Sequence, residues 1–537
     1  MNVGKYPQIA LQLFTALVLF AVAVTAAGCA PAVSPRISGT AYYVDCAKGN
    51  DANYGGSASQ AWRTLDKVNA TVFGPGDGVF LRRGTTCPGA LHPQGSGEDG
   101  LPITLSAYGW GARPVVNGGQ NQVAFELYDQ QYWHIQDIEI TGGTLVGLFI
   151  TGSETTGPLN HFRLTNLVVH DVYGEVISAK TTGLVVITSG GNDNTINDVV
   201  VDGVTAYDTN QWGGIIVDGP GYRAHPSRLS ADVAIRNSIV HHVYGDGIVL
   251  WNVQNGLIEN SVAYETGLQP PPRTIGTPSS IWTYFCRDCI VQNNESYLSH
   301  SPDVDGGSYD VDAGAENNLY QYNYGHDTDS YCLSVFGTGE LPSVNTTIRY
   351  NVCAYNGLDQ SQASSAGAVF FWTGNGGVLD GVQVYNNTIY WDPATTASAL
   401  YNQSNLAGDR PNFFKNNILF STSPWMIFTN SRLELNYNIY WYPGDKETIW
   451  SYGGETYKSF SEYQSGSGQD AHSLFADPLF REPGYHAAGR PETAYTVLNG
   501  SPVIDAGTDV GNMGGRDFLD NTIPYGKAYD IGACESH

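Results

Sequence analysis

Positive charge is the scarcest feature of this 537-residue sequence. It contains 25 Lys and Arg against 51 Asp and Glu, for a formal net charge of -26, and only 14% of its residues are charged. Because such a protein repels a phosphate backbone, a nucleic-acid partner is not expected. The sequence also lacks any motif typical of nucleotide or redox-cofactor binding. It is rich instead in Gly (64) and Tyr (34), which suits a turn-rich protein with ample apolar material for a core.

Long apolar runs are missing except near the N-terminus. Lys5 gives a positive start, Ala10 to Val24 is apolar, and Ala26-Ala27-Gly28-Cys29 follows, so residues 1–28 are predicted to be a signal peptide. Small residues directly before a cysteine resemble a bacterial lipobox, which implies an acylated Cys29 and a lipid anchor at the outer membrane or cell surface. The alternative is an ordinary secretory peptide cut near the same place. No later stretch is long enough to span a bilayer, so we expect the rest to be soluble, and we expect a monomer.

Cysteine is sparse, and an odd number remains after Cys29: Cys46, Cys87, Cys286, Cys289, Cys332, Cys353 and Cys534. Outside the cytoplasm cysteines tend to pair, and an odd number leaves at least one unpaired. We expect a Cys46–Cys87 disulfide because both residues flank N-terminal turns. A lone CxxC without a second pair or a nearby His is a weak zinc signal, so we interpret Cys286 and Cys289 as structural.

Helical periodicity is nearly absent. From Thr64 to Val72, Leu65, Val68 and Val72 recur at helical spacing, which predicts one short helix that caps the open end of the core. From about residue 101 onward, short runs of Val, Ile, Leu and Tyr are broken by Gly, Asn or Asp, which is typical of strands and turns. The absence of helices between strands excludes an α/β barrel and a doubly wound sheet.

The strand-forming part carries a repeat marked by asparagine, at positions 20 to 40 residues apart: Asn166, Asn197, Asn237, Asn260, Asn293, Asn323, Asn351, Asn386, Asn416 and Asn436. Four residues after each mark, eight of ten positions are aromatic or His: His170, Val201, His241, Tyr264, Tyr297, Asp327, Tyr355, Tyr390, Phe420 and Tyr440. Asn tolerates the left-handed backbone of a tight corner, and its amide can bond to the Asn of the neighbouring turn. The repeat therefore predicts stacked coils of short parallel strands.

This pattern predicts an all-β fold, a right-handed parallel β-helix over residues 40–537. We expect an N-terminal cap at about 40–100, an irregular C-terminal cap at about 445–537, and a linker at 29–39. A β-propeller or sandwich would also suit short strands and turns.

Several phrases carry a resemblance to a known family: the opening YYVD, WRTLDKVNATVFGPGDGVFLRRGTTC, LPITLSAYGWG, the N-x-x-x-Y turns, and the ending GSPVIDAGTDVG with YDIGACE. They resemble the right-handed β-helix proteins of the pectate-lyase-like superfamily over nearly all of residues 40–537. The resemblance implies a carbohydrate-active protein, but the superfamily includes polysaccharide lyases, glycoside hydrolases, uronan epimerases and phage depolymerases.

Carboxylates break the repeat in one region. Asp327 occupies a position that is aromatic or His in most turns, beside His326 and Asp329 in GHDTD. One turn earlier, DVDGGSYDVDAG supplies Asp305, Asp310 and Asp312. If Tyr309 and Val311 point inward, strand alternation directs Asp310 and Asp312 outward.

Aligning the second strand of neighbouring turns gives an outward column that would line a groove: Asp218, Trp251, Tyr284, Asp312 and Ser334. Asp246 approaches the same region from two repeats below. We expect these substrate-binding residues: Asp305, Asp246, Asp218, Trp251, Tyr284 and Arg287. Flat aromatic faces such as Trp251 and Tyr284 suit sugar rings.

Paired carboxylates are the groups that glycoside hydrolysis needs, one protonated and one ionised. We predict Asp312 and Asp327 as this pair, with Asp310, Asp329 and His326 tuning or orienting them, and no cofactor. These residues also fit other interpretations. Asp is common in turns, His326 could simply pack at a corner, and Asp305, Asp310 and Asp312 could bind calcium.

The sequence leaves three functions open for an exported protein that binds a polysaccharide. A glycoside hydrolase acting on a neutral or weakly charged glycan is favoured, because the net charge would repel an acidic polymer. A polysaccharide lyase or uronan C5-epimerase, with or without assistance by calcium, would need a base such as Arg287 or His326. A non-catalytic surface binder would need the aromatic column alone.

Overall fold

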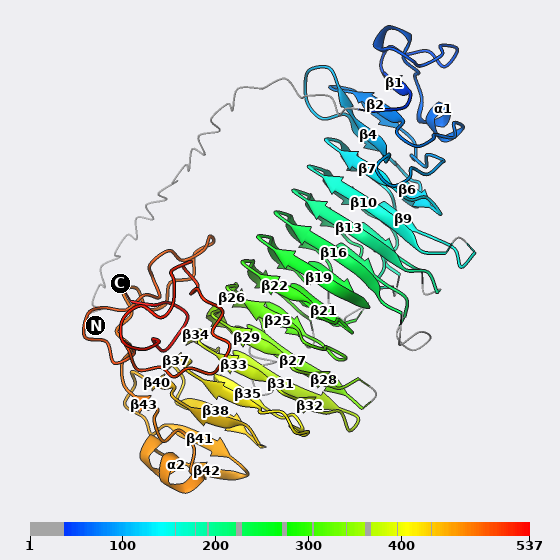
Figure 1. Ribbon diagram of the computed structural model, residues 1–537. Coiled ribbons are helices and arrows are strands. Elements are labelled where there is room, and N and C mark those ends of the chain that lie inside the picture. The colour runs from blue at the N-terminus through cyan, green and yellow to red at the C-terminus, as the bar shows by residue number, and fades with distance from the viewer. Residues whose placement is uncertain are drawn as a thin grey trace, which may run out of the picture. The chain divides into compact units, whose positions relative to one another are not determined.

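The computed structural model describes residues 37–536, apart from gaps at 156, 178, 191–192, 222–227, 271–275, 303–304, 340, 360–366, 395 and 431. In the described residues the chain winds through three long, parallel sheets, and each strand pairs with the equivalent strand of the next turn (Figure 1). This architecture is a parallel β-helix, so the predicted fold is confirmed. The predicted signal peptide, residues 1–28, and the predicted lipidation site Cys29 lie outside the described residues.

The first sheet, sheet 1, begins each turn, and its strands in spatial order are β1 (Ala41–Val44), β2 (Gly78–Arg82), β4 (Ile103–Tyr108), β7 (Trp133–Gln136), β10 (Leu159–Thr165), β13 (Ile196–Asp202), β16 (Ser230–Arg236), β19 (Val253–Glu259), β22 (Ile290–Gln292), β25 (Leu319–Gln321), β29 (Thr347–Arg349), β33 (Gln383–Tyr385), β36 (Phe413–Lys415) and β39 (Glu434–Asn436).

Sheet 2 follows sheet 1 across a tight corner, and its strands are β3 (Thr86–Pro88), β5 (Val115–Asn117), β8 (Glu139–Thr141), β11 (Val168–Val172), β14 (Thr205–Thr209), β17 (Ile239–Val243), β20 (Val262–Thr266), β23 (Glu295–Ser299), β26 (Tyr324–Thr328), β30 (Val352–Asn356), β34 (Thr388–Trp391), β37 (Ile418–Ser421), β40 (Ile439–Trp441) and β43 (Leu474–Phe475).

Sheet 3 completes each turn, and its strands are β6 (Val123–Tyr128), β9 (Val146–Thr151), β12 (Gly183–Thr188), β15 (Gly213–Asp218), β18 (Ile248–Trp251), β21 (Ile281–Tyr284), β24 (Tyr309–Val311), β27 (Leu333–Thr338), β31 (Val369–Gly374), β35 (Leu400–Asn402), β38 (Trp425–Thr429), β41 (Ile449–Tyr452) and β42 (Glu455–Tyr457). β42 pairs antiparallel with β41, and a small pair is formed by β28 (Ser343–Val344) and β32 (Leu379–Asp380).

The core lies inside the coil and is built from in-register columns of apolar side chains. One such column on sheet 1 is fully buried over five successive strands: Ile135, Leu164, Val201, Ile235 and Ile258. Because alternate residues of a strand point to opposite faces, the residues between these positions point outward. The outer face of each sheet is therefore free to carry polar chemistry.

Short helices lie near the two ends of the coil (Figure 1). Helix α1 (Leu65–Asn69) follows the short 3-10 turn at Ala58–Gln60, and Thr64 caps it by accepting from the Lys67 N–H. Leu65 and Val68 are buried in the core, which confirms a helix here. Val72 is 76% exposed beyond the end of α1, so the predicted helix was too long. Helix α2 (Phe460–Ser467) buries Tyr463 at the other end. None of the described helices has the length and apolarity to cross a membrane.

The asparagine repeat lies at the corner between sheets 1 and 2. Two consecutive positions of this corner favour asparagine, whereas the predicted repeat has one. The first takes the left-handed backbone, as at Asn237 (φ 52°) and Asn293 (φ 55°). The second is a buried ladder: Asn294, Asn323, Asn351, Asn387, Asn417 and Asn438. Each ladder residue donates to the next, as the Asn323 N–H does to Asn351 Oδ1 at 2.9 Å.

The predicted alignment therefore slips in four turns. Tyr322 and Tyr350, not the asparagines that follow them, take the left-handed corner, and Tyr437 does so next to Asn436. Asn197 lies inside β13, away from a corner.

Disulfides join Cys46 to Cys87, Cys286 to Cys289 and Cys332 to Cys353, while Cys534 is free and buried. The expected Cys46–Cys87 bridge is confirmed, and the CxxC forms a bridge of its own.

After β43 the chain runs back along the corner between sheets 1 and 2 without regular secondary structure (Figure 1). Arg349 donates to the Asn512 carbonyl at 2.7 Å, and Asn386 donates to the Asp530 carbonyl at 2.9 Å. We call residues 476–536 the C-terminal segment.

Candidate active site

The outer face of sheet 3 carries the candidate site. Strand pairing puts Asp218, Trp251 and Tyr284 in one outward column, and Asp312 follows directly after β24. Ser334 was expected in this column, but the strand pairing puts it in the neighbouring one. Its register partner is Asp310, which also pairs with Trp282 one turn below.

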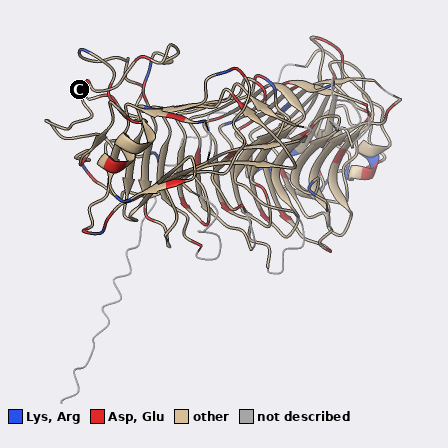
Figure 2. Cartoon of the chain, turned by 90° about the horizontal axis from the view of Figure 1, so that it is seen from below, with Lys and Arg blue, Asp and Glu red and all other residues tan. Residues whose placement is uncertain are grey.

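Acidic residues far outnumber basic ones in this chain (Figure 2). Four carboxyl groups on this face lie close enough to affect one another's pKa. Asp310 is 4% exposed, and its Oδ1 accepts from Ser334 Oγ at 2.6 Å. Asp312, more exposed, accepts from the Ala313 N–H at 2.6 Å. Asp305 lies in the loop before β24, and Asp246 lies before β18, two turns away. We call these four residues the carboxyl cluster.

A hydrogen-bond chain joins the two outlying members of the carboxyl cluster. The Ser279 N–H donates to Asp246 Oδ1 at 3.0 Å, and Ser279 Oγ is 2.8 Å from the Tyr331 hydroxyl. That hydroxyl is in turn 3.4 Å from Asp305 Oδ1. The indole N–H of Trp212 also donates to Asp246. These contacts position both carboxyls with side chains or backbone from three other turns, those of β15, β21 and β27.

Burial and mutual repulsion keep protons on this cluster. Burial, followed by the charges of Asp312 and Asp305, raises the pKa of Asp310 well above its usual value. Burial, with the charges of Asp305 and Asp246, raises the pKa of Asp312 to about 6, against opposing effects from the Ala313 N–H and Lys180. Burial also raises the pKa values of Asp305 and Asp246. Asp310 is therefore the group that holds its proton most firmly.

The sequence did not reveal that Lys180 lies beside the carboxyl cluster. Its Nζ is 3.8 Å from Asp246 Oδ2, donates to the Thr277 carbonyl at 3.0 Å, and lies 4.8 Å from the Trp212 ring centroid and 5.0 Å from that of Trp282. It comes from the loop between β11 and β12. Since no repeat position marks that loop, only the folded coil could show that this cation faces the acids.

An aromatic patch borders the carboxyl cluster. Trp212, Ile216, Val249 and Trp282 pack together outside sheet 3, and the partly buried Trp251 and Tyr284 lie against them. The Trp251 ring contacts the Trp282 ring edge-on at 5.4 Å. Asp218 heads this column, where burial raises its pKa to about 6 despite hydrogen bonds from Asn252 and Thr188. The predicted aromatic column is thus next to the acids.

Asp327 does not join the carboxyl cluster. It lies in β26 of sheet 2, so the structure does not form the predicted Asp312–Asp327 pair. The premise was wrong as well, because His326, not Asp327, stacks on Tyr297 in the aromatic ladder at 5.0 Å. Asp327 occupies the position directly after the ladder residue and has a left-handed φ of 50°. Asp208 and Glu265 occupy this position in other turns.

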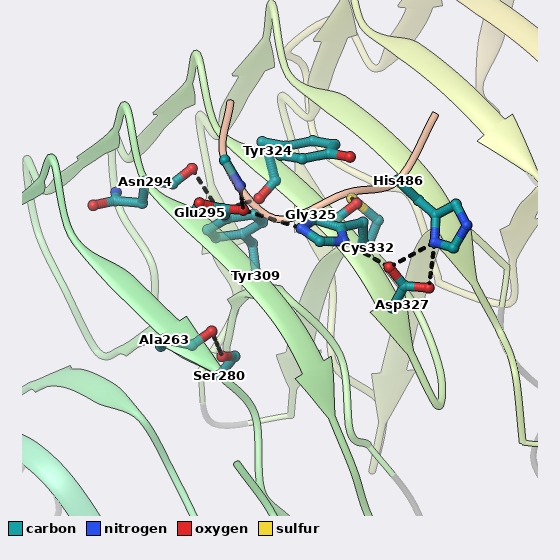
Figure 3. A network of polar contacts seen from close by, with 12 residues as sticks. Ala263, Ser280, Asn294, Glu295, Tyr309, Tyr324, Gly325, Asp327, Cys332 and His486 are labelled. Carbon is teal, nitrogen blue, oxygen red and sulfur yellow. Dashed lines mark hydrogen bonds and ion pairs between the residues drawn. The ribbon is translucent and has the colours of Figure 1, made fainter. Parts of the chain in front are cut away.

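Instead, Asp327 and Glu295 contact the C-terminal segment (Figure 3), and His326 joins these two carboxylates. His486 Nδ1 lies 2.9 Å from Asp327 Oδ1, and His326 Nδ1 lies 2.7 Å from Asp327 Oδ2. The other nitrogen of His326 is 3.2 Å from Glu295, which accepts from the Gly489 N–H at 2.6 Å. Burial lowers the pKa of His326, but the hydrogen bonds to Asp327 and Glu295 outweigh it, so the pKa is raised.

Two further predicted residues are engaged elsewhere. Asp329 accepts from the Ser301 N–H at 3.0 Å and lies 3.2 Å from His300 Nδ1. Arg287 donates to Glu316 at 2.8 Å, in the connection between β21 and β22. None of these three contacts involves the carboxyl cluster.

The fold and this outer-face site describe a parallel β-helix protein with an acidic, aromatic-lined surface. No protein-family model matches the sequence. The chain is 26% identical to lacto-N-biosidase of Bifidobacterium longum subsp. longum over 93% of its own length, and it spans 36% of the length of that relative. It is 28% identical to pectate lyase L of Dickeya dadantii over 46% of this chain and 55% of that enzyme.

Among solved structures, the GH136 lacto-N-biosidase of Eubacterium ramulus is similar with a TM-score of 0.54 and 22% identity, covering 69% of this chain and 67% of that one. At this identity the likeness shows a shared fold. The resemblance to carbohydrate-active β-helix proteins is confirmed at that level.

Proposed function

We propose that this chain is a glycoside hydrolase that cleaves a polysaccharide, with Asp310 and Asp312 as its two carboxyl groups. The observation that carries the proposal is the pair itself. Two side chains, one in β24 and one directly after it, face outward beside an aromatic patch, and the pKa of each is raised in a way that lets one keep its proton while the other ionises.

In this mechanism Asp310 gives its proton to the glycosidic oxygen while the bond from that oxygen to the anomeric carbon breaks. The ionised Asp312 either takes a proton from the attacking water or attacks the anomeric carbon itself. Asp305 raises the pKa values of both groups, Asp246 raises that of Asp312, and Lys180 limits both rises. Trp251 and Tyr284 offer apolar faces to neighbouring sugar rings.

The similarity to lacto-N-biosidase over 93% of this chain supports hydrolysis. The net charge of -26 supports a neutral or weakly charged glycan, since an acidic polymer would be repelled.

The test is turnover of a panel of plant, algal and bacterial glycans by the parent chain, Asp310→Asn and Asp312→Asn. Both variants should lose about two to four orders of magnitude in rate and keep the parent's circular dichroism spectrum. Asp232→Asn, an exposed aspartate at φ 59° on sheet 1, is the matched control and should keep full activity. Full activity in both site variants would reject the assignment.

A polysaccharide lyase is the second candidate, favoured by one observation: Lys180 is a base of the type that elimination needs, set among carboxyls. The similarity to pectate lyase L supports it. The oxygens of Asp305, Asp310 and Asp312 are donors that suit calcium, which would neutralise a uronate carboxylate. Loss of activity on chelation, with ultraviolet-absorbing unsaturated products, would identify a lyase.

We also propose that the protein works outside the cytoplasm, anchored through an acylated Cys29. Three disulfides among the described residues support an oxidising environment. Mass spectrometry of the mature N-terminus should find a lipid on Cys29, and Cys29→Ser should release the protein from membranes. An unmodified N-terminus would favour an ordinary secretory peptide.

A further inference from the structure

A cluster on the outer face of sheet 2 lies apart from the chemistry of sheet 3. Asp208 of β14 and the neighbours His241 and His242 of β17 bring one ligand atom each to within 4.8 Å of one another. The two histidine Nδ1 atoms are 2.6 Å apart. Three ligand atoms from two successive turns thus converge on one point.

The backbone explains how adjacent histidines can face the same point. Successive side chains of a strand normally point to opposite faces. His242 has the left-handed φ of 53°, which breaks this alternation. Tyr207 pairs with His241, so Asp208 is the equivalent of His242 one turn below. Asp208 also has a left-handed backbone, with φ 61°. His242 and Asp208 are therefore neighbours in one column.

His241 is held rigidly by its place in the aromatic ladder. Its ring is stacked between Tyr207, at 4.9 Å and 6°, and Tyr264, at 4.7 Å and 14°. This sandwich fixes the direction of its Nδ1 before any ligand arrives, which lowers the ordering cost of binding.

Glu265 of β20 orients the second histidine. Its Oε2 lies 2.7 Å from His242 Nε2, so that nitrogen carries the proton and Nδ1 presents its lone pair to the cluster. A carboxylate on the far nitrogen of a histidine is the usual support for a metal-bound imidazole. This contact is independent of the convergence of the three ligand atoms.

We propose that Asp208, His241 and His242 bind a divalent transition-metal ion of the zinc type, with Glu265 as the residue that orients His242. Two imidazole nitrogens and one carboxylate oxygen suit Zn²⁺, Ni²⁺ or Cu²⁺ better than Ca²⁺ or Mg²⁺, which prefer oxygen ligands. A fourth position is left for water. The ion links the turns that contain β14 and β17, so it stabilises the coil.

A second histidine pair offers a matched control. His134 Nε2 and His161 Nε2 are 2.9 Å apart on sheet 1, but Asp198 binds the other nitrogen of His161 at 2.7 Å. Asp198 also accepts from Arg163 at 2.5 Å, and this guanidinium disfavours a metal cation. The pair therefore has the imidazoles and the orienting carboxylate without a carboxylate ligand of its own.

The experiment is calorimetric titration of the full, tag-free chain with Zn²⁺ after chelator treatment and desalting. The parent should bind one ion per chain, and its melting temperature should rise with Zn²⁺. His242→Ala and Asp208→Asn should each weaken binding at least about tenfold and abolish that rise, and Glu265→Gln should weaken binding about ten- to a hundredfold. His161→Ala should bind as the parent does.

Because the His242 ring is exposed, its removal should leave the fold intact, which circular dichroism checks. No binding by the parent, or equal binding by His242→Ala and the parent, would overturn the proposal. Glycan turnover is not the readout, so this result is independent of the assignment on sheet 3.

Discussion

Asp312 combines a buried setting with like-charged neighbours, and this sets the pH dependence of the proposed reaction. Its pKa of about 6 means that it is half ionised near that pH and mostly ionised above it. Asp310 keeps its proton to higher pH. We predict that kcat/KM falls as the pH drops below about 6, because Asp312 takes up a proton, and falls again at high pH, when Asp310 loses its own. A rate that stays flat between about pH 4 and pH 6 would contradict these roles.

Asp218 provides a residue-scale prediction on stability. Burial raises its pKa from 3.8 to about 6, so the folded protein holds this proton more tightly than the unfolded chain does. Such a group contributes stability below pH 3.8 that is lost as the pH rises through about 6. Asp218→Asn keeps partners for Asn252 and Thr188 without the charge. We expect the free energy of unfolding to rise by up to about 3 kcal/mol at about pH 8, measured by urea denaturation.

The comparison at low pH is the control for Asp218→Asn. Well below pH 3.8 the parent side chain is protonated in both the folded and the unfolded state, so the variant and the parent should differ little. An equal gain at both pH values would show that the effect is not electrostatic.

The sequence predicted the acids of the candidate site better than their arrangement. Asp305, Asp310 and Asp312 interrupt their turn, and strand alternation correctly put Asp310 and Asp312 outward. Lys180 and Trp212 could not be found, because both reach Asp246 from turns far away in the sequence. Such meetings depend on loop lengths that no local pattern encodes.

At the scale of elements, the asparagine ladder should be a main support of the corner between sheets 1 and 2. The Asn351 side chain donates to the Tyr320 carbonyl and to Asn387 and accepts from Asn323, all without exposure to water. Asn351→Ala removes these buried hydrogen bonds and leaves the Asn323 N–H without the side-chain acceptor at Asn351. We expect the free energy of unfolding to fall by about 2 to 4 kcal/mol, measured by urea denaturation.

Gln383→Ala is the control for the ladder, because Gln383 is only partly buried in β33 of the same sheet. It should change the free energy of unfolding by less than about 1 kcal/mol. Equal effects of the two substitutions would mean that the ladder has no special role.

Strands, corners and the stacking repeat were predictable because each turn repeats the same local chemistry. The register within a turn was not. Aligning Asn323 with Asn293, when Tyr322 is the true corner residue, shifted Asp327 by one place into the aromatic ladder. The slip made Asp327 look like a break in the ladder, and the predicted acid–base pair then failed because Asp327 lies on sheet 2 whereas Asp312 follows β24 of sheet 3.

At the scale of the whole molecule, the C-terminal segment is held to the coil by contacts across long sequence separations. His486 binds Asp327, and Gly489 binds Glu295. We predict that Asp327→Asn weakens this docking, because the ion pair with His486 is lost and His326 loses a charged partner. Limited proteolysis and hydrogen exchange should show faster opening of residues 476–536.

Glycan turnover distinguishes this docking role from a catalytic one. Asp327→Asn should keep most of the parent's rate, since Asp327 lies on sheet 2, away from Asp310 and Asp312. A loss as large as that of Asp312→Asn would return Asp327 to the reacting groups.

The most direct measurement of the central claim is the mass of the products formed in heavy-oxygen water from the glycan that the panel shows to be cleaved. Hydrolysis by Asp310 and Asp312 should place one solvent oxygen in each new reducing end, and Asp312→Asn should form almost no product. Unsaturated products without solvent oxygen, or labelled products formed by Asp312→Asn at the parent's rate, would contradict the account.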